Sequence, residues 1–215
     1  MLIKSTKNNL SETLKKAVKL LNDGGIIAFP TETFYGLGVK FDMDDSLIRL
    51  YELKKRPVKK PMPLIIGSRK LLPSLVVSTN NSATALMDKF WPGPLTIILD
   101  AKRGLSRYLT VGTGMVAVRL PGESFALHLA EKAGFPITAT SANISGMPPA
   151  ENAEAVIKYF GDKIDMIIDG GKTPGGLPST IVDATEKDIK ILRKGAVSSS
   201  DIKDFMLITL KKLPN

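Results

Sequence analysis

The residues Thr140-Ser141-Ala142-Asn143-Ile144-Ser145-Gly146 follow a short apolar run, Phe135-Pro136-Ile137, that is typical of the end of a buried strand. Hydroxyls, an amide and a glycine pack poorly in a core, but they supply hydrogen bonds that suit an anion or a nucleotide. Similar clusters lie at Pro30-Thr31-Glu32-Thr33, after another strand-like run, and at Pro178-Ser179-Thr180, before a third. Three hydroxyl clusters at strand ends predict one shared pocket.

Hydrophobic periodicity predicts helices and strands in alternation along the chain. Helices are expected at about 10–21, 44–53, 82–90, 123–133, 151–160 and 200–212. Strands are expected at 26–29, 63–66, 95–99, 115–120, 137–140, 165–168, 181–183 and 189–192. Some neighbouring strands have no helix between them, so the pattern departs from a strict βαβ rhythm. The predicted fold class is therefore α/β (mixed α+β), a twisted mixed sheet with helices packed on its faces.

Length and composition indicate an ordinary globular protein. The chain has 215 residues, of which 43% are hydrophobic and 24% charged, and no linker divides it. We expect a single domain over 1–215, with its core at about 10–197 and a C-terminal helix after it. Cysteine is absent, which excludes disulfides and thiolate chemistry and fits a reducing cytoplasm. The apolar runs are too short to cross a bilayer, so no membrane partner is expected.

The net charge of +9 indicates anionic partners, and its distribution indicates where they bind. Five cationic residues fall within seven positions: Lys54, Lys55, Arg56, Lys59 and Lys60. Pro57 interrupts this segment and Pro61 follows it, which predicts a rigid basic loop suited to phosphates rather than a solvated helix face. Arg119 and Arg193 end apolar strands. Each suits either an ion pair with a nearby acid or a bidentate clamp on a carboxylate or phosphate.

Several familiar catalytic motifs are nearly present and fail on position or context. Gly171-Lys172-Thr173 resembles the end of a P-loop, but Met166 stands where the first glycine is required. The G-x-G-x-x-A string at 112–117 leads into a strand, whereas a dinucleotide site needs a helix there. His128 is the only histidine, so a zinc site or a serine-histidine triad is improbable. What remains is a site that binds anions and stabilises charge, as phosphoryl or nucleotidyl transfer requires.

The ordered set of motifs resembles the YrdC-like family, and the resemblance runs from about residue 10 to 197. The segments are PTETFYGLG at 30–38, KKRP at 54–57, WPGPLT at 91–96, RLP at 119–121, SANISG at 141–146, PSTIVD at 178–183 and RKG at 193–195. Each segment is weak alone, but seven in the family's order make a chance match very improbable. The resemblance implies a twisted mixed sheet with a large basic cavity, in the short, single-domain form of the family.

The resemblance also implies an activity, the synthesis of L-threonylcarbamoyladenylate and pyrophosphate from L-threonine, bicarbonate and ATP. A separate threonylcarbamoyl transferase would then modify adenosine 37 of certain tRNAs. ATP is the implied substrate, and Mg²⁺ would be carried with it because no carboxylate site for a metal stands out.

By resemblance, the site residues divide into two groups. The residues implied to bind ATP are Lys54, Arg56, Lys60, Ser141, Asn143 and Arg193, with Lys54 and Arg56 also catalytic. The residues implied to bind threonine are Thr31, Thr33, Arg119, Thr138 and Ser179. From the residues alone, Thr31 and Thr33 suit turn-stabilising hydrogen bonds equally well. Some family members carry a histidine after the residue that corresponds to Lys60, and this chain does not.

Two other functions are open. A family paralogue could use its basic cavity to grip tRNA or double-stranded RNA without synthesising anything, and the net charge fits that reading. The intact pair Ser141 and Asn143 argues against it. A carbamoyl-transfer domain like that of hydrogenase-maturation proteins is the third reading. A chain without cysteine lacks the zinc fingers that accompany such domains.

Overall fold

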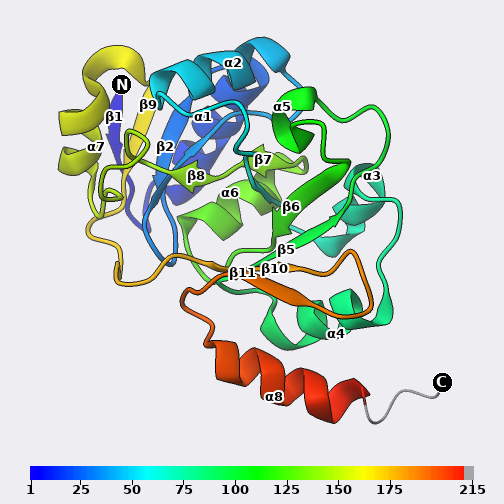
Figure 1. The fold of residues 1–215 in the computed structure, drawn as a ribbon. Coiled ribbons are helices and arrows are strands. Elements are labelled where there is room, and N and C mark those ends of the chain that lie inside the picture. Colours follow the sequence, from blue (N-terminus) through cyan, green and yellow to red (C-terminus); the bar gives the residue numbers. More distant parts are fainter. Residues whose placement is uncertain (211–215) are drawn as a thin grey trace.

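The strands form two mixed sheets in a computed structural model that describes residues 1–210 (Figure 1). The five-stranded sheet has the order β1 (Leu2–Lys4), β9 (Met166–Asp169), β2 (Ile27–Pro30), β3 (Tyr35–Gly38) and β8 (Thr140–Ser141). The pairs of β9 with β1 and β2 are parallel, and those of β3 with β2 and β8 are antiparallel. This sheet carries the first two hydroxyl clusters, 30–33 and 140–146.

The six-stranded sheet carries the third cluster and the arginines. Its order is β11 (Lys190–Arg193), β10 (Thr180–Asp183), β5 (Leu95–Asp100), β6 (Met115–Arg119), β4 (Leu64–Ile65) and β7 (Ile137–Thr138). The pairs β10–β5 and β4–β6 are parallel, and the other three are antiparallel. Ser179 directly precedes β10, while Arg119 and Arg193 end β6 and β11.

The two sheets meet where the chain passes from one to the other. β7 belongs to the six-stranded sheet and β8 to the five-stranded sheet, and only Ala139 separates them. An isolated bridge between Lys40 and Ile137 closes the same junction. A Cβ atom on Gly38 would lie 2.8 Å from the Thr138 carbonyl oxygen and 2.8 Å from the Phe29 ring. Position 38 therefore requires glycine because the sheets approach too closely for a side chain.

Gly38→Ala should lower the free energy of unfolding by about 1–3 kcal/mol, since overpacking forces strands apart at this junction. Urea denaturation checks the prediction. Gly134→Ala is not a fair comparison, because Gly134 has a positive φ of 69°. Gly36→Ala, in the same strand, is the matched control, because a Cβ atom there would lie no nearer than 3.4 Å to a neighbouring atom. A Gly38→Ala protein as stable as the wild type would contradict the close approach.

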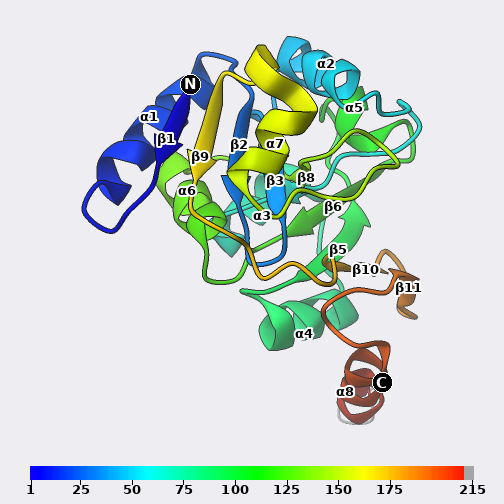
Figure 2. The ribbon, with the colours of Figure 1, turned by 90° about the vertical axis from the view of Figure 1, so that its left-hand side faces the viewer.

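Helices cover both faces of the five-stranded sheet (Figure 2). On one face, α1 (Leu10–Asn22) and α6 (Phe125–Ala133) pack on Ile27 and Phe29. On the other, α2 (Asp44–Leu53) and α7 (Ala153–Phe160) share a larger core with Ala28. Successive residues of a strand point to opposite faces, so an unbroken apolar run such as β2 is what a strand buried on both sides requires.

The remaining helices lie around the six-stranded sheet. They are α3 (Leu72–Leu75), α4 (Asn81–Phe90), α5 (Arg107–Thr110) and α8 (Ser199–Leu210). α8 packs on α4, where the rings of Phe205 and Phe90 meet edge to face at 5.7 Å (Figure 1). Within residues 1–210, no helix combines the length and apolar character that crossing a membrane would need.

The predicted fold class is confirmed, and the differences concern local elements. The strands divide between two sheets, and the expected strand 137–140 is two strands because the chain changes sheets at Ala139. β1, β3, α3 and α5 were not predicted. β3 carries Gly36 and Gly38, and glycine weakens the pattern by which strands are recognised. The expected helix 200–212 is observed as α8, and residues 211 and 212 lie outside the described residues.

Candidate active site

Residues of both sheets line one cavity of about 630 Å³. Eight of the eleven predicted site residues line it: Thr31, Thr33, Arg56, Lys60, Arg119, Ser141, Ser179 and Arg193. They come from sequence positions up to 162 residues apart, and all three hydroxyl clusters contribute at least one of them. The prediction of a single pocket shared by the three clusters is confirmed.

The cavity is positively charged. Its lining includes five cationic side chains, Arg56, Lys59, Lys60, Arg119 and Arg193, and no aspartate or glutamate. Burial lowers the pKa of Arg193, and the nearby charges of Arg119 and Arg56 lower it further. Clustered cations at this density repel one another, so the cavity is built to receive anionic groups.

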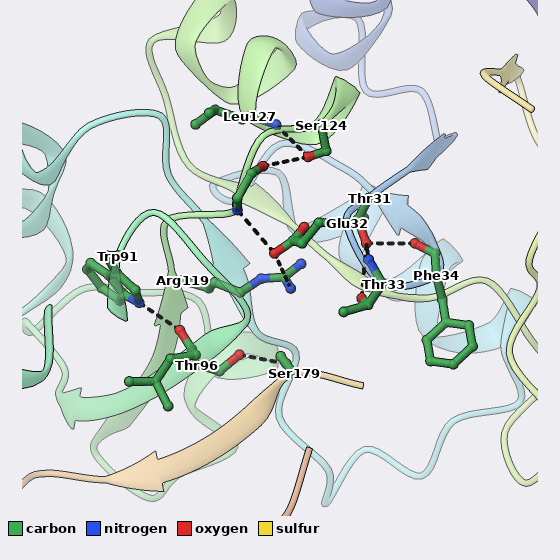
Figure 3. Close-up of polar contacts among 12 residues, drawn as sticks. Thr31, Glu32, Thr33, Phe34, Trp91, Thr96, Arg119, Ser124, Leu127 and Ser179 are labelled. Carbon is green, nitrogen blue, oxygen red and sulfur yellow. Dashed lines mark hydrogen bonds and ion pairs between the residues drawn. The ribbon is translucent and has the colours of Figure 1, made fainter. Parts of the chain in front are cut away.

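The sequence left open whether Arg119 forms an ion pair or clamps a ligand. In the structure it forms an ion pair with Glu32, and it also lines the cavity (Figure 3). Its Nη1 donates to Glu32 Oε1 at 3.0 Å, and the backbone N–H of Gly122 donates to the same oxygen at 3.1 Å. The Arg119 side chain is 7% exposed and that of Glu32 is 14% exposed. Burial lowers the pKa of the Arg119 guanidinium, and the Glu32 carboxylate acts in the opposite direction.

Thr31 and Thr33 shape the turn between β2 and β3 (Figure 3). The Thr31 hydroxyl donates to the Phe34 carbonyl at 2.7 Å and accepts from the Thr33 N–H at 3.0 Å. The two hydroxyl oxygens are 3.1 Å apart, and Thr31 has given its only proton to Phe34, so Thr33 is the donor. Thr31 is therefore occupied by the turn, while Thr33 keeps acceptor capacity at the cavity wall.

Hydrogen bonds to Ser179 hold the side chain of Arg193 at the cavity wall. Arg193 Nη2 donates to the Ser179 carbonyl at 2.7 Å and to its hydroxyl at 3.0 Å, and Nε donates to the carbonyl at 3.1 Å. The Ser179 hydroxyl also lies 2.9 Å from that of Thr96 (Figure 3). This network fixes the guanidinium of Arg193 in one orientation beside the serine hydroxyl.

Arg56 organises the basic loop around itself. Its Nε donates to the Lys60 carbonyl at 3.0 Å and its Nη2 to the Pro61 carbonyl at 2.8 Å. The Tyr51 hydroxyl also donates to the Lys60 carbonyl at 2.8 Å. Burial lowers the pKa of Arg56. The loop is thus folded onto the arginine, which presents its remaining N–H groups to the cavity.

Lys54 does not line the cavity, in contrast to the prediction. It is 1% exposed, and its ammonium group donates to the carbonyls of Ser141 and Asn143 and to Asn143 Oδ1. Burial, with a smaller effect of Arg56, lowers the pKa of Lys54 to about 7. Three oxygens match the three N–H donors of the charged form and favour it. Lys54 therefore holds the 141–146 segment in place without lining the cavity itself.

Asn143 and Thr138 also lie outside the cavity lining. Asn143 Oδ1 accepts from the Ser141 hydroxyl at 2.7 Å, and its amide nitrogen donates to the Met147 carbonyl. Thr138 is fully buried, and its hydroxyl accepts from the Val39 N–H at 3.0 Å. Both residues hold backbone in place at this edge of the site rather than facing the cavity.

Three contributing residues were not predicted as site residues. Lys59 lines the cavity, and its place in the basic loop was a signal that could have found it. Glu32 lies between the two predicted threonines, so its position in the motif was a second signal. Thr96 ends the WPGPLT segment at 91–96, which was a third signal, although only the pairing of β5 with β10 brings it to Ser179.

Known proteins of one family are similar to this chain in sequence and in fold. The family model for Sua5, YciO and YrdC proteins, described as telomere recombination, matches residues 19–195. A threonylcarbamoyl-AMP synthase from Pyrococcus abyssi is 40% identical over 189 residues, which are 88% of this chain and 56% of that protein. One from Klebsiella pneumoniae is 36% identical over 180 residues, which are 82% of this chain and 94% of that protein.

A solved structure of Pyrococcus abyssi Sua5 complexed with L-threonine matches with a TM-score of 0.89 and 36% identity, covering 95% of this chain and 60% of that one. The chain thus spans little more than half the length of the Pyrococcus abyssi proteins and nearly the whole length of the Klebsiella pneumoniae one. The match to the family model, over most of the chain, and the similarity to these relatives together show that the chain belongs to the Sua5/YciO/YrdC family.

Proposed function

We propose that this chain is a threonylcarbamoyl-AMP synthase, which forms L-threonylcarbamoyladenylate and pyrophosphate from L-threonine, bicarbonate and ATP. The observation that carries the proposal is the single cavity that brings Arg119, Thr33 and Ser179 together with Arg56 and Arg193. Relatives of this chain are named for the same activity, and one solved relative holds L-threonine.

The threonine end of the site is proposed at Arg119. A guanidinium clamps a carboxylate with paired N–H donors, and Arg119 retains N–H groups after bonding to Glu32. Thr33 and Ser179 supply hydroxyls at the same wall. Pro61, Pro63, Leu64 and Ile65 give the cavity an apolar side, where some family members carry a histidine. Held in this way, the amino group points away from the clamp and toward the nucleotide.

The phosphate end is proposed at Arg56, Lys60 and Arg193, with Ser141 beside them. The threonine amine adds to carbon dioxide derived from bicarbonate and loses a proton, which gives a carbamate. A carbamate oxygen then attacks the α-phosphorus of ATP, and the bond to the β-phosphate breaks, so that pyrophosphate leaves with the electron pair. The cations offset the charge that grows on the phosphates, and alignment in one cavity contributes about 7 kcal/mol or more.

Magnesium and the later steps belong to the same proposal. Residues 1–210 contain no cluster of three or more acidic or histidine side chains that could hold a metal ion. We therefore propose that magnesium arrives with ATP.

The acyl adenylate is a mixed anhydride and reacts readily with water, so a separate transferase that modifies tRNA adenosine 37 is the proposed recipient.

The test is a product assay with each substrate omitted in turn. The purified chain, ATP, bicarbonate and L-threonine should yield an AMP-linked threonylcarbamate, identified by mass spectrometry, with an equal amount of pyrophosphate. Omitting threonine or bicarbonate should stop pyrophosphate release. Salt-sensitive RNA binding without any adenylate would replace this proposal with the RNA-binding alternative.

A further inference from the structure

Glu32 has a contact pattern that a purely structural ion pair does not need. Arginine–carboxylate pairs are frequently bidentate, with both carboxylate oxygens bonded. Here one oxygen, Oε1, accepts from both Arg119 and Gly122, while Oε2 is buried without a hydrogen-bond partner among the described residues. Within residues 1–210, the pair therefore fixes Glu32 at one oxygen and leaves most N–H groups of the Arg119 guanidinium without a hydrogen-bond partner (Figure 3).

Glu32 also sets the charge at one end of the cavity. Of the five cations that line it, Arg119 is the one paired with a carboxylate within residues 1–210, and Arg56, Lys59, Lys60 and Arg193 have no such partner there. The cavity thus has a phosphate end with excess positive charge and an Arg119 end whose charge is offset. A triphosphate suits the first end. A zwitterion, with a carboxylate and an ammonium group, suits the second.

We infer that Glu32 is a positioning residue that orients Arg119 and makes this end of the cavity selective for an amino acid over a second anion. The inference rests on the proposed function, because it assigns the amino-acid end of that site. Glu32 acts in two ways. Its hydrogen bond holds the guanidinium in place through the Gly122 backbone, and its charge removes the repulsion that an uncompensated cation would exert on the substrate's ammonium group.

The experiment measures binding of two small ligands by calorimetry at constant ionic strength. L-threonine is the zwitterion, and malonate is an anion of similar size without an amine. Glu32→Gln keeps the shape and an acceptor oxygen but removes the charge. The matched control is Asp88→Asn, which removes the acid of the exposed Arg69 pair, outside the cavity lining. Circular dichroism and thermal melting show whether each variant is folded.

Glu32→Gln should weaken threonine binding about tenfold or more and should tighten malonate binding, while Asp88→Asn changes neither. The KM for threonine should rise in proportion, and the KM for ATP should stay within about twofold. Weaker binding of both ligands would show a merely structural role and overturn the inference, as would unchanged threonine binding.

Two further measurements keep the result unambiguous. If Glu32→Gln is not folded, Glu32→Asp replaces it. That variant keeps the charge, so malonate should bind as weakly as in the wild type while threonine binds less tightly, and tighter malonate binding would overturn the inference. Failure of the proposed function gives a different result, since the wild type would then form no adenylate whatever the ligand preference of the variants.

Discussion

Arg56→Ala should reduce threonine-dependent pyrophosphate release by roughly 10²- to 10³-fold, the usual cost of removing one preorganised charge-stabilising group from an active site. Arg56 lines the cavity and folds the basic loop by bonding to the Lys60 and Pro61 carbonyls. Alanine removes both the charge and those bonds. The measurement is the initial rate of pyrophosphate release with saturating threonine and bicarbonate.

The fold should survive this change, because residues 54–63 belong to no helix or strand between the end of α2 and β4. Arg103→Ala, an exposed arginine outside the cavity lining, is the matched control and should retain full activity. Arg56→Lys separates the two contributions, since it keeps a charge but cannot reproduce the fork of two carbonyl bonds. A wild-type rate in Arg56→Ala would remove Arg56 from the proposed mechanism.

Lys54→Met should destabilise the protein and inactivate it, although Lys54 does not line the cavity. Methionine fills a similar space but takes one donor from each of the Ser141 carbonyl, the Asn143 carbonyl and Asn143 Oδ1. Asn143 Oδ1 keeps the Ser141 hydroxyl and the Ser141 carbonyl keeps the Asn143 N–H, so within residues 1–210 the Asn143 carbonyl is the oxygen left without a donor. An unsatisfied buried carbonyl costs about 1–3 kcal/mol, and the two lost charge-assisted bonds to the other oxygens add to it, so we expect a total loss of about 2–4 kcal/mol in the free energy of unfolding. Urea denaturation and the pyrophosphate assay measure the two effects.

The control for Lys54→Met is Lys55→Met, which changes the exposed neighbour and should affect neither stability nor rate. Two different results are informative about the role of Lys54. Reduced stability together with lost activity agrees with a lysine that holds the 141–146 segment in place without lining the cavity itself. Unchanged stability with a selective rise in the KM for ATP would instead support direct phosphate contact, which is what the sequence resemblance implied.

Most of the site could be predicted from the sequence because its residues lie in short local motifs. Thr33 in its turn, Arg56 directly before Pro57, and Arg119 and Arg193 at strand ends each occupy a position that local chemistry makes conspicuous. Lys54 shows that a local motif does not reveal whether a side chain is buried. Lys54 and Arg56 are both cations of one basic loop, and the sequence does not distinguish their roles. In the structure Lys54 is buried against carbonyls, whereas Arg56 lines the cavity.

The sequence by itself determined the fold class, the family and the three hydroxyl clusters, because periodicity and turn chemistry are local properties of neighbouring residues. Only the tertiary structure decided that the strands divide into two sheets at Ala139, that Thr96 meets Ser179 and that Glu32 pairs with Arg119. These contacts join residues that are 83 and 87 positions apart. They depend on how strands pair and how closely the sheets approach, and no local pattern of side chains specifies that.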